Sequence, residues 1–339
     1  MMSELGNSLS IRDEVVCIVG MHRSGTSLIA HLLQQSGLFL GSEDTLLGSN
    51  VGNQNGHFEH LGFIELHDAI LKHLGGSWEF PPELRPGWED ADFLEPLRCR
   101  ARDLVRSFAG KGPWGWKDPR TTLLLPFWRS LIPNLRFVIC VRSPLAVANS
   151  LHARNAMPLM RGAFLWDRYM RSALVDTDSS RRLVVFYDTF FTNPVQEVAT
   201  LREFCGLATG GEAALAATIR ADLRHQQSDL ATLLACSEIA SETKLLYLAL
   251  RGLELSGAGM ARCDSGVDNA ISELMRLFAN TPQHQILDRL QSRLNQSESE
   301  LAYLRREIWR DAKENHPWAY RFYRKILRPF QLARFRSSH

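Results

Sequence analysis

The chain has 339 residues, of which 45% are hydrophobic and 22% are charged, and its formal net charge at pH 7 is only +2. This balance is typical of a soluble globular protein that buries a sizeable core. It excludes a polyelectrolyte that binds nucleic acid through its overall charge, and no nucleic acid partner is expected.

Residues 1–12 contain no apolar segment like that of a signal peptide, and we expect them to form a flexible N-terminus. The six cysteines show no CxxC or zinc-ligand spacing, so no metal site is expected. They are interpreted as buried thiols of a reducing compartment. No apolar run is long enough to span a bilayer. Together these features predict a cytoplasmic protein.

The first predicted element is an apolar strand, Val15 to Val19, which turns through Gly20 and Gly25 into an apolar helix. Backbone N–H groups and a helix N-terminus converge at such a turn, where they bind phosphate or sulfonate groups. The glycine spacing matches a P-loop, but Thr26 holds the position of the Walker lysine and Arg23 is the nearest cation. The hydroxyl groups of this loop belong to Ser24, Thr26 and Ser27.

Without the Walker lysine and a Walker-B carboxylate, this loop is poorly equipped for triphosphate chemistry. Its amides, hydroxyls and single guanidinium suit a monophosphate joined to a second oxyanion. The simpler alternative is a tight strand-to-helix turn in which Ser24 caps the helix and the glycines only allow the bend.

The loop from Gly48 to His60 is rich in glycine and asparagine and ends with His57, Glu59 and His60. A partly buried carboxylate or a histidine can act as a general base near neutral pH. The structural alternative is that Glu59 only favours the start of the next helix, from about Leu61, through the helix dipole.

A second polar motif follows the apolar strand Phe137 to Val141. Arg142 lies at the carboxyl end of this strand, Pro144 occupies the first turn of a helix, and Ser150 follows on that helix. We expect the guanidinium and the hydroxyl to point at one anion, at the edge where open α/β sheets bind ligands. Taken alone, Arg142 is also explained by an ion pair with a surface carboxylate.

Strands alternate with helices over most of the chain, which predicts an α/β fold with a P-loop-type parallel sheet and helices on both faces. Further strands are expected at about residues 115–117 and 183–187, within a catalytic domain over residues 13–255. Helices are expected over Gly25 to Ser36, Leu61 to Leu74, Asp90 to Ala109, Thr121 to Leu131, Pro144 to Arg154, Pro194 to Cys205, Glu212 to Arg220 and Glu242 to Leu255.

A C-terminal helical extension is expected after a linker at residues 256–266. Leucines and one isoleucine recur at spacings of three and four within residues 267–312. This pattern predicts either a short coiled coil that joins two copies of the chain or an amphipathic helix packed on its own domain. Residues 313–339 form a basic aromatic tail with no acid after Glu314. It suits peripheral contact with an anionic inner membrane or docking into an acidic protein groove.

These motifs resemble the two cofactor-binding motifs of the PAPS-dependent sulfotransferases, which transfer a sulfuryl group from 3′-phosphoadenosine-5′-phosphosulfate (PAPS). GMHRSGTS is similar to the 5′-phosphosulfate loop, in the arginine form of bacterial members. VRSPLAVANS is similar to the 3′-phosphate motif, and WGWKDPRTTLLLPFW to a Lys-Asp-Pro segment of the family. ADLRHQ, residues 221–226, is a weaker match. The resemblance covers about residues 15–207.

The resemblance implies PAPS as cofactor, 3′,5′-ADP (PAP) as product and no metal. It places Arg23 on the bridging and leaving oxygens, Lys117 on the sulfonate oxygens and Arg120 near the substrate. The residues that it assigns to cofactor binding are Arg23, Ser24, Gly25, Thr26, Ser27, Arg142, Ser150 and Arg224.

In related sulfotransferases the base lies after the first helix, so Glu59 matches by position, with His57 as the alternative. The acceptor implied is a hydroxyl of a carbohydrate or glycolipid. Two other functions stay open: a P-loop kinase with a degenerate Walker motif, which would need ATP and Mg²⁺, and a non-catalytic nucleotide-binding scaffold.

Overall fold

The computed structural model describes residues 15–48, 57–220 and 228–255. All of them lie in the first of the two units of the chain, Met1–Thr281. The expected N-terminal segment, linker, coiled-coil or amphipathic helix and basic tail lie outside the described residues, as does Arg224. Within the described ranges, no helix combines the length and the apolar character needed to cross a bilayer.

The sheet contains four parallel strands in the order β2-β1-β3-β4. Their bounds are β1 (Val15–Gly20), β2 (Trp114–Lys117), β3 (Leu135–Val141) and β4 (Arg182–Phe186). All residues of β1 are buried, as in a parallel sheet that is covered on both faces. The register pairs Gly20 with Cys140, so the chain segments that follow β1 and β3 leave the same edge of the sheet as neighbours. This is the edge where such sheets bind ligands.

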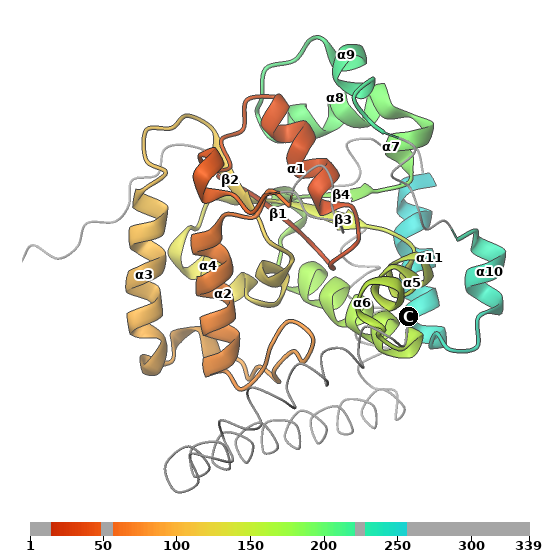
Figure 1. Cartoon of the computed structure of the whole chain (residues 1–339), viewed down its shortest axis with the longest axis horizontal. Coiled ribbons are helices and arrows are strands. Elements are labelled where there is room, and N and C mark those ends of the chain that lie inside the picture. The colour runs from red at the N-terminus through yellow and green to blue at the C-terminus, as the bar shows by residue number, and fades with distance from the viewer. Residues whose placement is uncertain (1–14, 49–56, 221–227, 256–339) are drawn as a thin grey trace, which may run out of the picture. The chain divides into compact units, whose positions relative to one another are not determined.

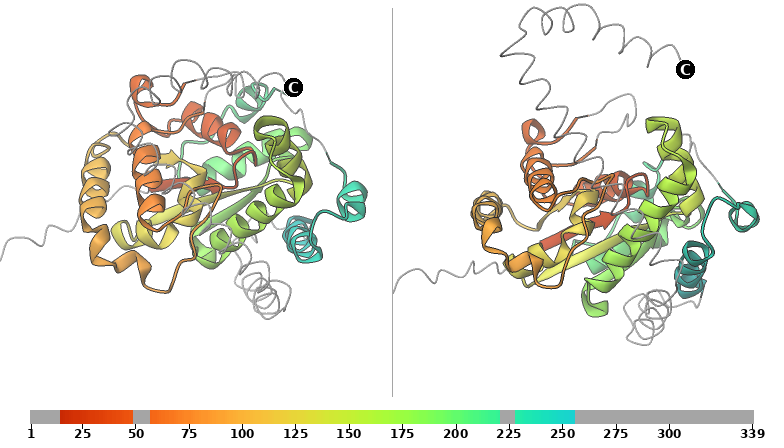
Figure 2. Two further views of the ribbon diagram at one scale, coloured as in Figure 1. Left: turned by 60° about the horizontal axis from the view of Figure 1, so that its bottom comes forward. Right: turned by 90° about the horizontal axis from the view of Figure 1, so that it is seen from below.

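Helices cover both faces of the sheet, as predicted (Figures 1 and 2). One face packs against four helices: α1 (Thr26–Gln35), α7 (Thr189–Thr192), α8 (Pro194–Phe204) and α9 (Glu212–Ala216). The other face carries the larger core, built with α2 (Leu61–His73), α3 (Glu95–Arg106), α4 (Leu125–Leu131), α5 (Pro144–Asn155), α6 (Leu159–Val175), α10 (Leu230–Ala235) and α11 (Ser241–Leu255). Alternate strand residues supply the two cores, as the two-residue period of a strand requires.

The helix expected over Asp90 to Ala109 begins later than predicted. Two short 3-10 helices, η2 (Trp88–Asp90) and η3 (Asp92–Leu94), precede α3, which has Pro96 in its first turn. Proline lacks an N–H group and clashes with a preceding helical turn, so it fits only at the start of a helix. The proline therefore sets the boundary.

The helix expected over Thr121 to Leu131 is divided in the same way. A 3-10 helix, η4 (Pro119–Leu123), is followed by α4, whose first turn contains Pro126. Three α-helices were not predicted: α6, α10 and the four-residue α7. For α6 the signal was present, because Leu165, Trp166 and Tyr169 recur on one buried face.

The expectation that the cysteines are buried is correct for the strand positions but not throughout. Cys17 in β1 and Cys140 in β3 are buried, whereas Cys99 is exposed. Cys99 lies on α3, whose buried positions are Leu97, Ala101 and Val105, so its thiol belongs to another face of the helix.

Candidate active site

The loop between β1 and α1 needs both of its glycines. Gly20 has a φ angle of +137°, and a Cβ atom there would lie 2.6 Å from the carbonyl oxygen of Cys140. Gly25 has a φ angle of +93°, and its Cβ atom would lie 2.2 Å from Cδ2 of Tyr187. Only glycine tolerates these angles and distances without strain. The loop is therefore held tightly against the ends of β3 and β4.

Ser24 does not cap α1. The N-cap residue is Gly25, and among the described residues no side chain forms a cap hydrogen bond with this helix. The hydroxyl of Ser24 is buried and, within the same ranges, its Oγ atom has no hydrogen-bond partner. The simple turn capped by Ser24 is therefore wrong. A buried hydroxyl beside the N-terminus of a ten-residue helix is suited to an anion.

Arg23 connects this loop with the second motif. Its Nε atom donates to Oγ of Ser150 at 2.8 Å, and its backbone carbonyl accepts from Nη1 of Arg142 at 3.0 Å. Burial, and then the charges of Arg154 and Arg142, lower the pKa of Arg23. The cations therefore repel one another, and a bound anion would relieve that repulsion.

Arg142 is buried at the carboxyl end of β3. Its guanidinium carbon lies 4.5 Å from the centroid of the Tyr187 ring, and Nε1 of Trp166 donates to its backbone carbonyl at 2.9 Å. Arg142 is therefore an interior side chain and not an exposed surface one. Tyr187 directly follows β4, and sequence reasoning did not identify it as part of the site.

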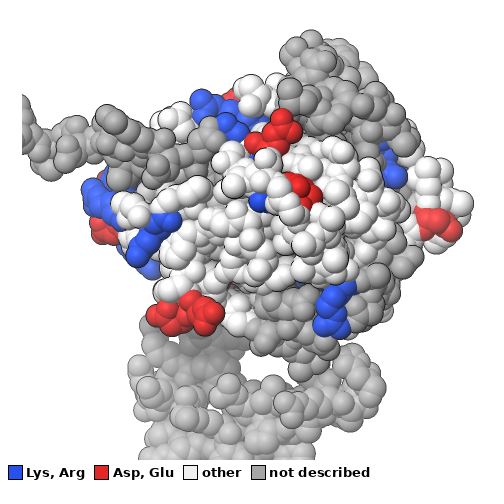
Figure 3. All heavy atoms as spheres, turned by 90° about the horizontal axis from the view of Figure 1, so that it is seen from above, with Lys and Arg blue, Asp and Glu red and all other residues white. Residues whose placement is uncertain are grey.

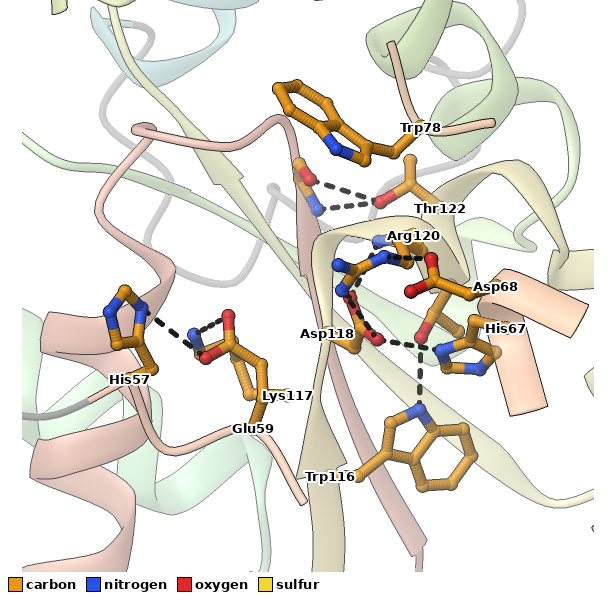
Figure 4. Close-up of polar contacts among 12 residues, drawn as sticks. His57, Glu59, His67, Asp68, Trp78, Trp116, Lys117, Asp118, Arg120 and Thr122 are labelled. Atoms are coloured by element: carbon orange, nitrogen blue, oxygen red, sulfur yellow. Dashed lines mark hydrogen bonds and ion pairs between the residues drawn. The ribbon is translucent and has the colours of Figure 1, made fainter. Parts of the chain in front are cut away.

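A buried ion pair joins the end of β2 to the segment before α2 (Figure 4). Nζ of Lys117 lies 2.5 Å from Oε1 of Glu59 and donates to Oγ of Ser27 at 3.3 Å. Burial lowers the pKa of Lys117 despite the opposing charge of Glu59. Burial likewise raises the pKa of Glu59 despite the charge of Lys117. Each partner is thus shifted toward its neutral form.

Glu59 does not start the following helix. The N-cap of α2 is His60, whose Nδ1 atom accepts from the N–H group of Gly62 at 3.1 Å. Oε2 of Glu59 is buried and forms no hydrogen bond among the described residues. It lies 3.6 Å from Nδ1 of His57. Burial and the charge of Lys117 lower the pKa of His57 to about 4, which keeps this imidazole neutral near pH 7.

Arg120 lies in a second polar cluster, directly after β2 (Figure 4). Its Nη1 atom donates to Oδ1 of Asp118 at 3.1 Å, and its Nε atom lies 2.7 Å from Oδ1 of Asp68. Nε1 of Trp128 donates to Nε2 of His67 at 2.8 Å, so the proton of this imidazole is on Nδ1, 2.8 Å from Oδ2 of Asp118. The charge of Arg120 is therefore already engaged by two carboxylates, and its role in substrate binding stays a prediction.

Three further side chains, those of His22, Trp78 and Arg154, lie near these motifs. The rings of His22 and Trp78 have centroids 4.4 Å apart. The charge of Arg154 helps to lower the pKa of His22, of His57 and of Arg23. A signal existed for Arg154, because it follows Ser150 by four residues on one helix. Trp78 comes from the connection between α2 and α3.

No metal centre accompanies these groups in the described part of the chain. There, no three His, Cys, Asp or Glu side chains gather in a way that could hold a metal ion. Arginine and lysine side chains supply positive charge at the candidate site.

A sequence model of the sulfotransferase family matches residues 16–210, more than half of the chain. No match is found among curated protein sequences. Sulfotransferase STF1 from Mycobacterium tuberculosis H37Rv aligns at 15% identity and a TM-score of 0.45, over 68% of this chain and 76% of that one. The sulfotransferase domain of the Synechococcus PCC 7002 olefin synthase aligns at 16% identity and a TM-score of 0.41, over 79% and 95%. With TM-scores below 0.5, the family assignment rests on the sequence match.

Proposed function

This chain belongs to the sulfotransferase family and is an enzyme of sulfuryl transfer; we propose that its donor is PAPS and its acceptor a hydroxyl group of a carbohydrate or glycolipid. The contact between the two motifs carries the proposal. Arg23 donates to Ser150 and accepts from Arg142, which brings the loop after β1 and the segment after β3 to one place. PAPS carries phosphate groups at the 3′ and 5′ positions of its ribose. A protein that binds it therefore needs two adjacent anion sites of this kind.

The chemistry of these groups fits the donor. The buried Oγ of Ser24 and the N-terminus of α1 suit the 5′-phosphate, together with Thr26 and Ser27. Arg142 and Ser150 suit the 3′-phosphate, because a guanidinium and a hydroxyl both donate to phosphate oxygens. Arg224, which lies outside the described residues, is proposed as a further cofactor contact.

When bound, PAPS supplies the sulfuryl group: its bond between sulfur and the 5′-phosphate oxygen breaks while a bond from sulfur to the acceptor oxygen forms, and PAP leaves. Glu59 takes the acceptor proton on Oε2, the oxygen that does not face Lys117. Arg23 and Lys117 stabilise the negative charge that develops on the leaving oxygen and the sulfonate. Arg120 would contact the acceptor.

Three variants test this assignment. Arg23→Ala and Arg142→Ala each remove a charge-assisted contact to phosphate, so PAP should bind about 10- to 100-fold more weakly in calorimetry. Glu59→Gln should bind PAP as the wild type does but lose at least about 100-fold in transfer of labelled sulfate from PAPS to a cell-envelope extract.

Glu65→Gln is the matched control, because Glu65 is exposed on α2, and it should change neither quantity. Unchanged PAP affinity in both arginine variants would contradict the donor assignment. Full transfer activity in Glu59→Gln would remove Glu59 from the role of base.

A further inference from the structure

The indole ring of Trp78 packs beside the loop that follows β1. Its ring lies 4.4 Å from that of His22, in the loop itself, and 6.0 Å from the guanidinium carbon of Arg154. Tyr169 in turn lies 6.2 Å from His22, edge to face. Neither cofactor motif requires Trp78 or Arg154.

Two side chains of α6 hold the backbone at Trp78 in place through hydrogen bonds. The hydroxyl group of Tyr169 donates to the carbonyl oxygen of Trp78 at 3.1 Å, and Arg161 donates to the carbonyl oxygen of Glu79. A loop of this kind is ordinarily mobile, and two side chains of one helix tie down consecutive carbonyls here. Trp78 therefore presents a preorganised surface.

Arg154 supplies a cation that has no carboxylate partner in the part of the chain that the structure describes. It lies on α5 four residues after Ser150, hence on the face that contacts Arg23. Its Nε atom donates to the Asn155 side chain at 2.6 Å, and within the described residues its guanidinium forms no ion pair. Its exposed position leaves the guanidinium accessible to an anion.

The neighbours of Arg154 differ from those of Arg142. The charges that act on it are those of Glu79, Glu59 and Arg120. Arg142, by contrast, contacts Tyr187 and the Arg23 carbonyl. The two arginines therefore contact different rings: Arg142 lies against Tyr187, whereas Arg154 lies 6.0 Å from the Trp78 ring.

His22 adds a polar atom to the same surface. Its Nε2 atom is buried and has no hydrogen-bond partner in the described part of the chain. Burial lowers its pKa well below the ordinary value, so the imidazole is neutral and can either donate or accept one hydrogen bond. A hydroxyl group would satisfy this nitrogen.

We propose that Trp78, His22 and Arg154 form the acceptor subsite, and that the acceptor is a sugar that carries an anionic group. The apolar face of the sugar ring stacks on Trp78, a ring hydroxyl bonds to Nε2 of His22, and the anionic group pairs with Arg154. This inference rests on the proposed function, because it needs an acceptor beside Glu59.

The test measures binding of two probes to the full chain saturated with PAP: p-nitrophenyl β-D-glucuronide and p-nitrophenyl β-D-glucoside. They differ only at C6, which is a carboxylate in the glucuronide and a hydroxymethyl group in the glucoside. Calorimetry should show at least about tenfold tighter binding of the glucuronide, from one charge-assisted pair. Arg154→Ala should abolish that preference and leave PAP affinity within about threefold. Trp78→Ala should weaken both sugars, and Trp78→Phe should restore part of the loss.

Arg106→Ala is the matched control, because Arg106 is exposed and already paired with Asp103 on α3. Equal binding of the two sugars, or binding of neither, would overturn the inference. So would an Arg154→Ala variant that loses PAP affinity, because Arg154 would then belong to the donor side. Failure of the wild type to bind PAP would instead contradict the proposed function itself.

Discussion

At the scale of single residues, Lys117 connects the two parts of the proposed chemistry. Its buried Nζ atom contacts Glu59, the proposed base, and Ser27, in the helix turn proposed to hold the phosphosulfate. A buried ion pair of this kind stabilises a fold little, because desolvation of both charges offsets their attraction. The proposed sulfuryl transfer explains the Lys117–Glu59 pair better. In that reaction Lys117 places a positive charge between the proton acceptor and the leaving group.

The pH dependence of kcat follows from this pair. A base acts only when deprotonated, so kcat should fall as the pH falls through the pKa of Glu59, which burial raises above the ordinary value of about 4.3. Lys117→Met removes the charge that opposes this rise, so the acidic limb should move to higher pH. Initial rates of transfer between pH 4 and 9 measure both profiles.

His57→Gln separates the two candidate bases in the same assay. The pKa of His57 is lowered to about 4, so a limb due to His57 would lie there and vanish in the variant. We expect His57→Gln to keep the limb of the wild type and to lose less than about tenfold in kcat. A limb that disappears in this variant would assign the base to His57.

At the scale of elements, the loop between β1 and α1 depends on contacts with two other strands. The sequence predicted a strand, a glycine-containing turn and a helix, and the structure confirms them. It did not reveal that Cys140 and Tyr187 approach the two glycines. The tight loop results from packing as much as from its own residues.

Gly25→Ala tests that packing. The new Cβ atom would lie 2.2 Å from the Tyr187 ring, so the ring must move, together with Arg142 that packs on it. We expect a loss of about 2 to 4 kcal/mol in unfolding free energy, from backbone strain and overpacking, and at least about tenfold weaker PAP binding.

Gly37→Ala is the control for backbone strain. Gly37 has a φ angle of +98°, close to that of Gly25, but a Cβ atom there meets nothing within 4 Å. This variant should cost only about 1 to 2 kcal/mol and leave PAP binding unchanged. Equal effects of the two substitutions on PAP binding would show that the contact with Tyr187 does not shape the loop.

At the scale of the whole molecule, the cluster around Asp118 joins the sheet to the helices of the larger core. His67 comes from α2, Trp128 from α4, and Asp118 directly follows β2. These groups are buried. On the face of the molecule drawn in Figure 3, basic and acidic side chains lie among neutral ones. Loss of the Asp118 charge would leave Arg120 and His67 without a buried carboxylate partner, so this cluster should contribute to the stability of the fold.

Asp118→Asn should reveal this contribution through its pH dependence. Burial by itself raises the pKa of Asp118, but the Arg120 charge and the His67 hydrogen bond outweigh it and hold the pKa well below the ordinary value of about 3.9. The stabilisation is thus complete above that ordinary value and is lost as the pH falls toward the folded-state pKa. Denaturant unfolding at pH 7 should show a loss of about 3 to 5 kcal/mol in the variant, and a smaller one at pH 3.

Asp68→Asn removes the other carboxylate beside Arg120. Its side chain is 53% exposed, so the loss should be below about 1 kcal/mol at either pH. Comparable losses in both variants at pH 7 would contradict a special role for the buried cluster.

The sequence by itself determined the fold class and the two motifs of the proposed donor site. These rest on signals within a few residues of one another: an apolar strand, a glycine turn, a helix and a cation at a strand end. The sequence also contained local signals for the helix boundaries at Pro96 and Pro126 and for the amphipathic α6. The predicted element bounds did not take these signals into account. Family resemblance, rather than spacing, suggested that Glu59 and Lys117 serve one reaction.

Only the tertiary structure decided which distant side chains share the site. Trp78 and Tyr187 come from separate segments, and no local pattern indicates that they approach the loop after β1. It also decided that two carboxylates engage Arg120 and that the Ser24 hydroxyl does not cap its helix. The physical reason is that periodicity and turn chemistry act between near neighbours in the chain, whereas side chains meet across the sheet only where its packed layers bring them together.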